Sequence, residues 1–279
     1  MKNKVLPIDK QERLRRILER MESLVVAFSG GMDSSYLLKV AAATLPSRLI
    51  AVTADFSAVG RKEILAAKRI ARSFGVRHAV VAVDPLGREP VVANDPMRCY
   101  HCKREIFSVL RRFAAMNRMH TVADGTTVDD ARSYRPGLRA LKELGIRSPL
   151  REAGMSKNDI ALLSAQMGLT TAGKPSRPCL LTRFPYGERI TPEKLKRVAA
   201  AEAFLAGLGF SALRVRVHGA LARIEVLPGD TMRALDAARR QSIIRRFRKL
   251  GFDYVTLDIE GFRSGSMDEP LRRAARRQR

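Results

Sequence analysis

The chain has 279 residues, of which 46% are hydrophobic and 29% charged, so it can bury a core as one large domain or two modest ones. Lys and Arg number 52 against 28 Asp and Glu, and the net charge of +24 favours anionic partners such as nucleotides, phosphorylated metabolites or nucleic acid. Three cysteines exclude a framework of paired disulfides, and we expect neither a signal peptide nor a membrane span. These features predict a cytoplasmic protein with reduced thiols.

Short apolar runs alternate with amphipathic stretches through the first part of the chain. We expect strands at 24–28, 49–53, 79–83 and 121–123, and helices at 34–43, 62–74 and 156–167. This alternation predicts an α/β fold with a parallel sheet flanked by helices. Ser156 and Asp159 have the spacing of a helix-capping box.

A stretch rich in Pro and Gly at 173–187 separates a second module from the first. There we expect helices at 192–208 and 231–250 and strands at 213–217, 222–227 and 254–259. Thr191 can cap the first of these helices, with Pro192 at its first position. We predict a nucleotide domain over 1–186 and a smaller α+β domain over 187–279 that ends in a basic tail.

A Gly-rich turn lies between the first predicted strand and the helix after it. In this turn Gly30 and Gly31 allow the backbone to approach a phosphate, and the hydroxyls of Ser29 and Ser34 add donors. Asp33 is unfavourable beside bare phosphate, which suggests bound Mg²⁺. The turn lacks the Lys of a Walker A loop and the spacing of a dinucleotide fingerprint. With strand before and helix after, it predicts phosphate binding rather than an ordinary turn.

The signature SGGMDS resembles that of the PP-loop ATP pyrophosphatase superfamily. Its members split ATP between the α and β phosphates and adenylate an oxygen of the substrate. The resemblance implies ATP as cosubstrate, with pyrophosphate held in this loop.

The three cysteines are Cys99 and Cys102, in a C-x-x-C unit, and the distant Cys179. The pair alone fits a redox dithiol, half of a zinc site or buried small side chains. Three thiolates are one short of the usual set for a [4Fe–4S] cluster and would leave one iron open to sulfide. Arg183 lies near Cys179, and a nearby cation favours the nucleophilic thiolate. Cys179 is therefore a candidate sulfur donor, cluster ligand, or both.

Six segments in order along nearly the whole chain resemble the LarE family of ATP-dependent sulfur transferases, which build the nickel-pincer cofactor of lactate racemase. They are VVAFSGGMDSS, DPMRCYHCK, ADGTTVDDARSYRPG, KPSRPCLLTRFPYGERIT, LRVRVHGALARIEV and GFDYVTLDIEGFRSGSM. One kind of LarE sacrifices a single cysteine, at the position of Cys179, and another holds a [4Fe–4S] cluster on three cysteines. We favour the cluster kind, with Cys99, Cys102 and Cys179 as ligands.

The resemblance also implies roles for polar residues. Gly125 is expected against the nucleotide and Asp129 near the active site, although an acidic pair after a strand also caps helices. Arg214 and Arg216 face one side of a predicted strand and are assigned, with Lys103, to the substrate; an exposed basic strand face is the plainer interpretation.

The reaction implied is adenylation of the carboxylates of pyridinium-3,5-biscarboxylic acid mononucleotide, followed by replacement of oxygen by sulfur from a sulfide source. The resemblance suggests a homo-oligomer, with a hexamer as one candidate. A PP-loop tRNA thiolase fits the net charge, but we find no added RNA-binding module and expect no nucleic-acid partner. An amide-forming PP-loop ligase would not need the cysteines, and a non-enzymatic nucleic-acid binder would not cleave ATP.

Overall fold

The computed structural model describes residues 6–56, 60–132, 135–173, 179–263, 265–271 and 273, with the backbone alone at 131 and 132. The chain divides into two compact units, the first formed by 1–91 and 97–177 and the second by 92–96 and 178–279. Residues 174–178, which carry the start of the KPSRPC motif, and the basic tail at 274–279 lie outside the described residues.

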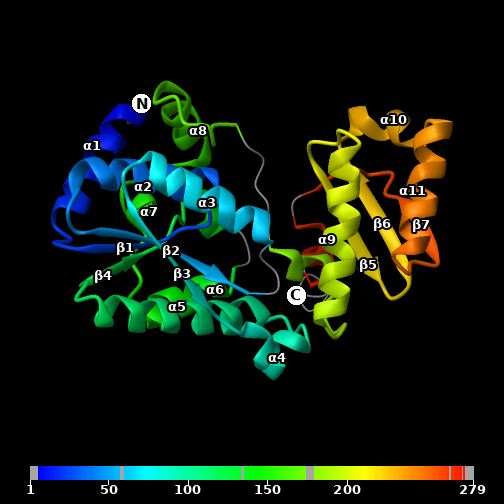
Figure 1. Cartoon of the computed structure of the whole chain (residues 1–279), viewed down its shortest axis with the longest axis horizontal. Coiled ribbons are helices and arrows are strands. Elements are labelled where there is room, and N and C mark those ends of the chain that lie inside the picture. Colours follow the sequence, from blue (N-terminus) through cyan, green and yellow to red (C-terminus); the bar gives the residue numbers. More distant parts are fainter. Residues whose placement is uncertain are drawn as a thin grey trace. The chain divides into compact units, whose positions relative to one another are not determined.

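The first unit is built on a four-stranded parallel sheet with the order β3-β2-β1-β4 (Figure 1). Its strands are β1 (Leu24–Ala27), β2 (Leu49–Asp55), β3 (Arg77–Ala82) and β4 (Thr121–Ala123). Its helices are α1 (Pro7–Glu19), α2 (Met32–Thr44), α3 (Arg61–Ser73), α4 (Glu89–Val92), α5 (Arg98–Met116), α6 (Gly137–Glu143), α7 (Pro149–Glu152) and α8 (Lys157–Gln166), with short 3₁₀ turns η1 (Pro85–Gly87) and η2 (Asp129–Arg132). The predicted α/β class is confirmed.

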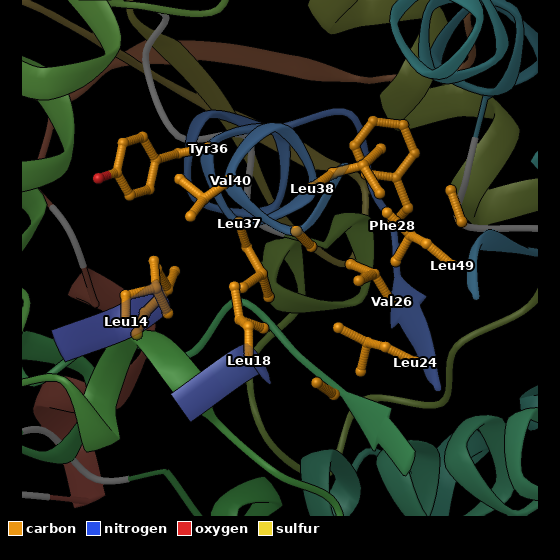
Figure 2. Packing of buried hydrophobic residues seen from close by; sticks show 14 of the residues in the cluster. Leu14, Leu18, Leu24, Val26, Phe28, Tyr36, Leu37, Leu38, Val40 and Leu49 are labelled. Carbon is orange, nitrogen blue, oxygen red and sulfur yellow. The ribbon is translucent and has the colours of Figure 1, made fainter. Parts of the chain in front are cut away.

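Two hydrophobic layers cover this sheet because successive β1 side chains point to opposite faces. Val26 packs with α1, α2, α3 and α8, whereas Val25 packs with α5 and α6. Figure 2 shows the first layer, in which Leu14 and Leu18 of α1 and Leu37 of α2 gather over β1. The sheet is therefore buried on both faces, as parallel sheets require.

The second unit contains a three-stranded sheet with the order β5-β6-β7, in which β5 and β6 are antiparallel and β6 and β7 parallel. Its elements are η3 (Leu180–Arg183), α9 (Pro192–Gly207), β5 (Leu213–His218), β6 (Leu221–Val226), η4 (Pro228–Asp230), α10 (Thr231–Leu235), α11 (Ala237–Lys249), β7 (Tyr254–Leu257) and η5 (Ser266–Asp268). This is the small α+β unit that the sequence predicts.

Local sequence explains several helix boundaries. Ser156 accepts a hydrogen bond from the backbone N–H of Asp159 and caps α8, and Thr191 caps α9 ahead of Pro192. The prediction of one helix over 231–250 was wrong, because Asp236 adopts ψ 135° and its carboxylate caps a new helix, α11, at the N–H of Arg239. The sequence analysis also missed the 19-residue helix α5.

Candidate active site

The phosphate loop connects β1 to α2 at the carboxyl edge of the parallel sheet. Gly31 is the residue before α2 and supplies no side-chain cap, so the first N–H groups of α2 face outward for a ligand. The hydroxyls of Ser29 and Ser34 lie 3.1 Å apart, and Ser29 Oγ accepts from the N–H of Gly31 at 3.3 Å. The loop thus presents backbone and hydroxyl donors at one helix terminus, an arrangement that suits a polyphosphate.

At Gly30 in this loop and at Gly125 beside it, a side chain would contact neighbouring backbone. Gly30 has φ +71°, and a Cβ there would lie 3.2 Å from the Cα of Ala67 on α3. A Cβ on Gly125, just beyond β4, would lie 3.1 Å from the backbone nitrogen of Ser34. The structure therefore brings Gly125 against the start of α2, next to the expected phosphate donors.

Asp33 lies at the same helix terminus with a carboxylate that has lost much of its hydration. Burial raises its pKa from 3.8 to about 6, the positive charge of Lys157 opposes that rise, and Asp130 adds to it. The buried Oδ1 of Asp33 accepts no hydrogen bond from the described residues. A buried carboxylate oxygen of this kind fits a divalent cation that accompanies ATP.

The acidic pair after β4 is held by structural contacts. The carboxylate of Asp129 accepts from the N–H of Lys157 at 2.7 Å and so ties this loop to α8. Burial acts to raise the pKa of Asp130, but hydrogen bonding by Thr127 and the charges of Arg135 and Lys157 outweigh it and lower that pKa. The role of Asp129 at the nucleotide stays a prediction.

The C-x-x-C pair occupies the first turns of α5, in the same unit as the phosphate loop. Cys99 is half-buried and Cys102 is buried, and their spacing of three residues places them as neighbours on the helix surface. Arg98 is 3% exposed and donates to Cys99 Sγ at 3.5 Å. One thiol of the pair is thus accessible beside a buried cation.

Lys103 links the cysteine turn of α5 to the end of β4. Its Nζ lies 3.7 Å from Oδ2 of Asp124, the residue before Gly125, and 6.0 Å from the ring centre of Phe107. Asp124 lies in the ADGTTVDDARSYRPG segment that carries the family resemblance, but no role was predicted for it from the sequence. The contact brings the side chain that follows Cys102 toward the edge of the sheet where α2 begins.

Cys179 belongs to the second unit and is exposed at the start of η3. Its carbonyl accepts from the N–H of Thr182 at 3.0 Å, the Thr182 hydroxyl at 2.8 Å and Nη1 of Arg183 at 3.4 Å. Arg183 is 1% exposed and pairs with Glu202 at 2.6 Å. Arg183 therefore holds the backbone of the Cys179 turn through a buried ion pair, and Glu202 is a site residue that the sequence analysis missed.

Arg214 and Arg216 on β5 are both buried, so the interpretation of this strand as an exposed basic face was wrong. Arg216 pairs with Glu225 at 3.0 Å and donates to the carbonyl of Thr182 at 3.0 Å. Arg214 stacks over Phe262 at 4.8 Å, and burial lowers its pKa to about 10. Burial likewise lowers the pKa of Arg216, although Glu225 opposes that effect. The two guanidinium groups form a desolvated cationic cluster beside the Cys179 turn.

Metal ligands are not gathered into a site by the described residues, in which no three His, Cys, Asp or Glu side chains form a metal-binding group. The acidic side chains of the second unit are engaged by arginines: Glu225 pairs with Arg216 and Arg223, and Asp258 with Arg223 and Arg263. Two of the three cysteines lie in the first unit and one in the second.

A family match supports the interpretation of this loop as a nucleotide-binding loop. Residues 11–93, which include β1, the phosphate loop and α3, match the asparagine synthase family. None of the described helices is long and apolar enough to cross a membrane. The fold and the loop together define an ATP-dependent enzyme of the PP-loop class, which excludes the non-enzymatic binder.

Three relatives match along most of the chain. One is an uncharacterized protein of Synechocystis sp., 39% identical over 262 residues, which are 94% of this chain and 98% of that protein. Another is the pyridinium-3,5-bisthiocarboxylic acid mononucleotide synthase of Lactiplantibacillus plantarum, 38% identical over 270 residues, 95% of this chain and 96% of that enzyme. An uncharacterized protein of Methanocaldococcus jannaschii is 30% identical over 243 residues, 87% and 92% of the two chains. The chain belongs to the LarE family of PP-loop enzymes.

Proposed function

We propose that this enzyme inserts sulfur into pyridinium-3,5-biscarboxylic acid mononucleotide at the expense of ATP, giving the bis-thiocarboxylate. The named relative, identical at 38% of positions over nearly its whole length, is a synthase of the bisthiocarboxylic acid mononucleotide. The observation that carries the proposal is that the cysteine turn of α5 and the phosphate loop lie in one unit, where Lys103 pairs with Asp124 and the next residue, Gly125, lies against the start of α2.

ATP is needed because a carboxylate is a poor electrophile, since its leaving group would be oxide. Attack of the carboxylate oxygen on the α-phosphorus forms an acyl-adenylate and releases pyrophosphate. The donors of Ser29, Gly30, Gly31 and Ser34 would hold that pyrophosphate, with Asp33 beside the accompanying Mg²⁺. Sulfur then attacks the activated carbonyl carbon, and AMP leaves with the electron pair of the C–O bond.

Cys99, Cys102 and Cys179 are the proposed holders of the sulfur. Thiolates suit a [4Fe–4S] cluster, and both Cys99 and Cys179 are accessible. Such a cluster would supply an iron site that binds sulfide. In this proposal Cys99, Cys102 and Cys179 are the ligands, and Arg183, which pairs with Glu202, fixes the backbone of the Cys179 turn. In the alternative mechanism the Cys179 thiolate attacks the acyl-adenylate and AMP leaves. Loss of the Cys179 Cα proton then breaks the Cβ–S bond, which leaves thiocarboxylate on the substrate and dehydroalanine at position 179.

We assign the phosphate of the pyridinium nucleotide to the β5 arginines. Burial lowers the pKa of Arg214 to about 10 because the charged guanidinium loses hydration. A bound anion beside the guanidinium would offset part of this desolvation free energy. Arg216 also donates to the carbonyl of Thr182 in the Cys179 turn, so the proposed phosphate site lies beside that turn. In this proposal the first unit binds ATP, the second unit binds the pyridinium nucleotide, and the enzyme works as a homo-oligomer.

A tRNA thiolase is the second candidate, and the net charge of +24 is the observation that favours it. The deciding experiment supplies anaerobically purified enzyme with Mg-ATP, sulfide and either the pyridinium dicarboxylate nucleotide or unmodified tRNA, and analyses the products by mass spectrometry. We expect sulfur in the pyridinium nucleotide together with AMP and pyrophosphate. Sulfur in tRNA alone would overturn the proposal in favour of the thiolase.

A further inference from the structure

Asp124 is buried in a network that leaves its side chain one orientation. It is 6% exposed, and its Oδ1 accepts from the N–H of Thr126 at 3.2 Å and the hydroxyl of Ser148 at 2.8 Å. Its Oδ2 accepts from the hydroxyl of Thr126 at 2.5 Å and faces Nζ of Lys103 at 3.7 Å. A carboxylate held by three donors is a rigid anchor for a flexible ammonium side chain.

Packing guides the stem of Lys103 as well. A Cβ on Gly137, the first residue of α6, would lie 2.7 Å from Lys103 Cδ, so a side chain at this position would displace the Lys103 stem from its path. The aliphatic stem therefore passes next to Gly137, and the ammonium lies 6.0 Å from the ring centre of Phe107 and faces Asp124 at the end of β4. The pair also carries no net charge, so the buried carboxylate does not repel an incoming phosphate as Asp33 would.

This anchored ammonium lies next to the phosphate loop. Gly125 follows Asp124 directly, and a Cβ on Gly125 would lie 3.1 Å from the backbone nitrogen of Ser34 in the first turn of α2. Lys103 also follows Cys102 directly on α5. A phosphate between these elements would have the α2 donors on one side and Lys103, with the cysteine turn, on the other.

We propose that Lys103 is a catalytic residue that binds the α-phosphate of ATP and stabilises departing AMP, and that Asp124 is its positioning residue. The proposal rests on the proposed function. In sulfur transfer the acyl C–O bond breaks, a C–S bond forms, and the bonding pair moves to the phosphate oxygen, so AMP gains one negative charge. A donor cation at that oxygen is bound more strongly in the transition state than in the acyl-adenylate. This assigns Lys103 to AMP rather than to the pyridinium substrate.

The test compares AMP with adenosine as ligands of the full-length protein by titration calorimetry. Lys103→Met removes the ammonium and keeps an apolar side chain next to Gly137. Because a charge-assisted hydrogen bond to phosphate is lost, we expect affinity for AMP to fall about tenfold or more while affinity for adenosine is unchanged. Asp124→Asn should give a smaller loss in the same direction, about threefold. Arg104→Ala, which removes an exposed cation one residue along α5, is the charge-matched control and should alter neither affinity.

The outcomes separate this proposal from its rivals. Equal losses for AMP and adenosine in Lys103→Met would mean that Lys103 only stabilises the fold, and an unchanged preference for AMP would mean that it does not touch phosphate; either result overturns the proposal. Wild-type protein that binds AMP no better than adenosine would overturn it too. These titrations need no pyridinium nucleotide, so a failure of sulfur insertion with a phosphate-specific loss in Lys103→Met would contradict the proposed function and leave the role of Lys103 standing.

Discussion

Gly30 of the phosphate loop lies against Ala67 in the middle of α3, so close that a Cβ on the glycine would meet the Ala67 Cα at 3.2 Å. The φ of +71° at Gly30 lies in the left-handed region, which also favours glycine at this position. The loop that receives phosphate is thus supported from behind by a buried helix face, and its shape depends on the absence of a single side chain.

This contact predicts an asymmetry between the two glycines of the loop. Gly30→Ala should reduce the free energy of unfolding by about 1–2 kcal/mol, from backbone strain and the Ala67 contact, and should weaken ATP binding. Gly31→Ala, where φ is −77° and a Cβ meets only Ser29 Oγ, should cost less stability. Urea denaturation of both variants measures the difference. Equal costs would mean that the Gly30–Ala67 packing is not what constrains the loop.

Asp33 predicts a pH dependence of stability. Because burial raises its folded-state pKa from 3.8 to about 6, the charged form is disfavoured in the folded state, and stability is lost as the pH rises through 6. Asp33→Asn should therefore stabilise the ATP-free protein by about 1 kcal/mol near neutral pH, a value reduced for partial exposure. Below about pH 4 both states are protonated and the difference should vanish. Unfolding curves across this range, compared with Asp129→Asn, test the sign; a difference that grows toward acid would contradict it.

The buried pair of Arg216 and Glu225 should dominate the stability of the second unit. Glu225 is fully buried. Its carboxylate forms an ion pair with Nη2 of Arg216 at 3.0 Å and accepts a hydrogen bond from the Ser266 hydroxyl at 2.7 Å. Glu225→Ala strands a buried guanidinium and should cost about 3–5 kcal/mol. Glu12→Ala breaks exposed pairs on α1 and should cost under about 0.5 kcal/mol. Similar costs in calorimetric unfolding would show that the β5 arginines are solvated.

Iron analysis separates the two sulfur mechanisms. Anaerobically purified protein should be brown and hold about four irons per chain, because three thiolates suit a cluster with one open iron. Cys102→Ser should lose most of that iron, whereas Ser108→Ala on the same helix should not. Colourless wild-type protein in which Cys179 loses the mass of its sulfur during turnover would select the sacrificial mechanism instead.

Several elements of both units were predictable from local sequence. The β1 run, the SGGMDSS turn and the caps at Ser156 and Thr191 each have short-range causes, and each lies where the sequence placed it. The site as a whole was less predictable because its contacts are long-range. The sequence around Asp124 does not predict its contact with Lys103, which lies 21 residues earlier. The sequence around Arg183 does not predict its ion pair with Glu202.

Helix α5 and the burial of the β5 arginines were not predicted, each for a specific reason. Helix α5 was not predicted because its first turns are polar and hold the cysteines. Its buried side chains Phe107, Leu110 and Ala114 show helical spacing only further along the segment. The β5 arginines look like a solvated face in sequence, since burial of a guanidinium depends on partners such as Glu225 that arrive from other elements.

The central claim is that ATP activates a carboxylate so that sulfur held at Cys99, Cys102 and Cys179 replaces its oxygen. Its most direct test is the product formed from the pyridinium dicarboxylate nucleotide, Mg-ATP and sulfide by wild-type enzyme and by each single Cys→Ser variant, with pyrophosphate release measured in parallel. The account predicts thiocarboxylate from the wild type only, while the variants still form the acyl-adenylate and release pyrophosphate. Thiocarboxylate formed at the wild-type rate by the variants would contradict it.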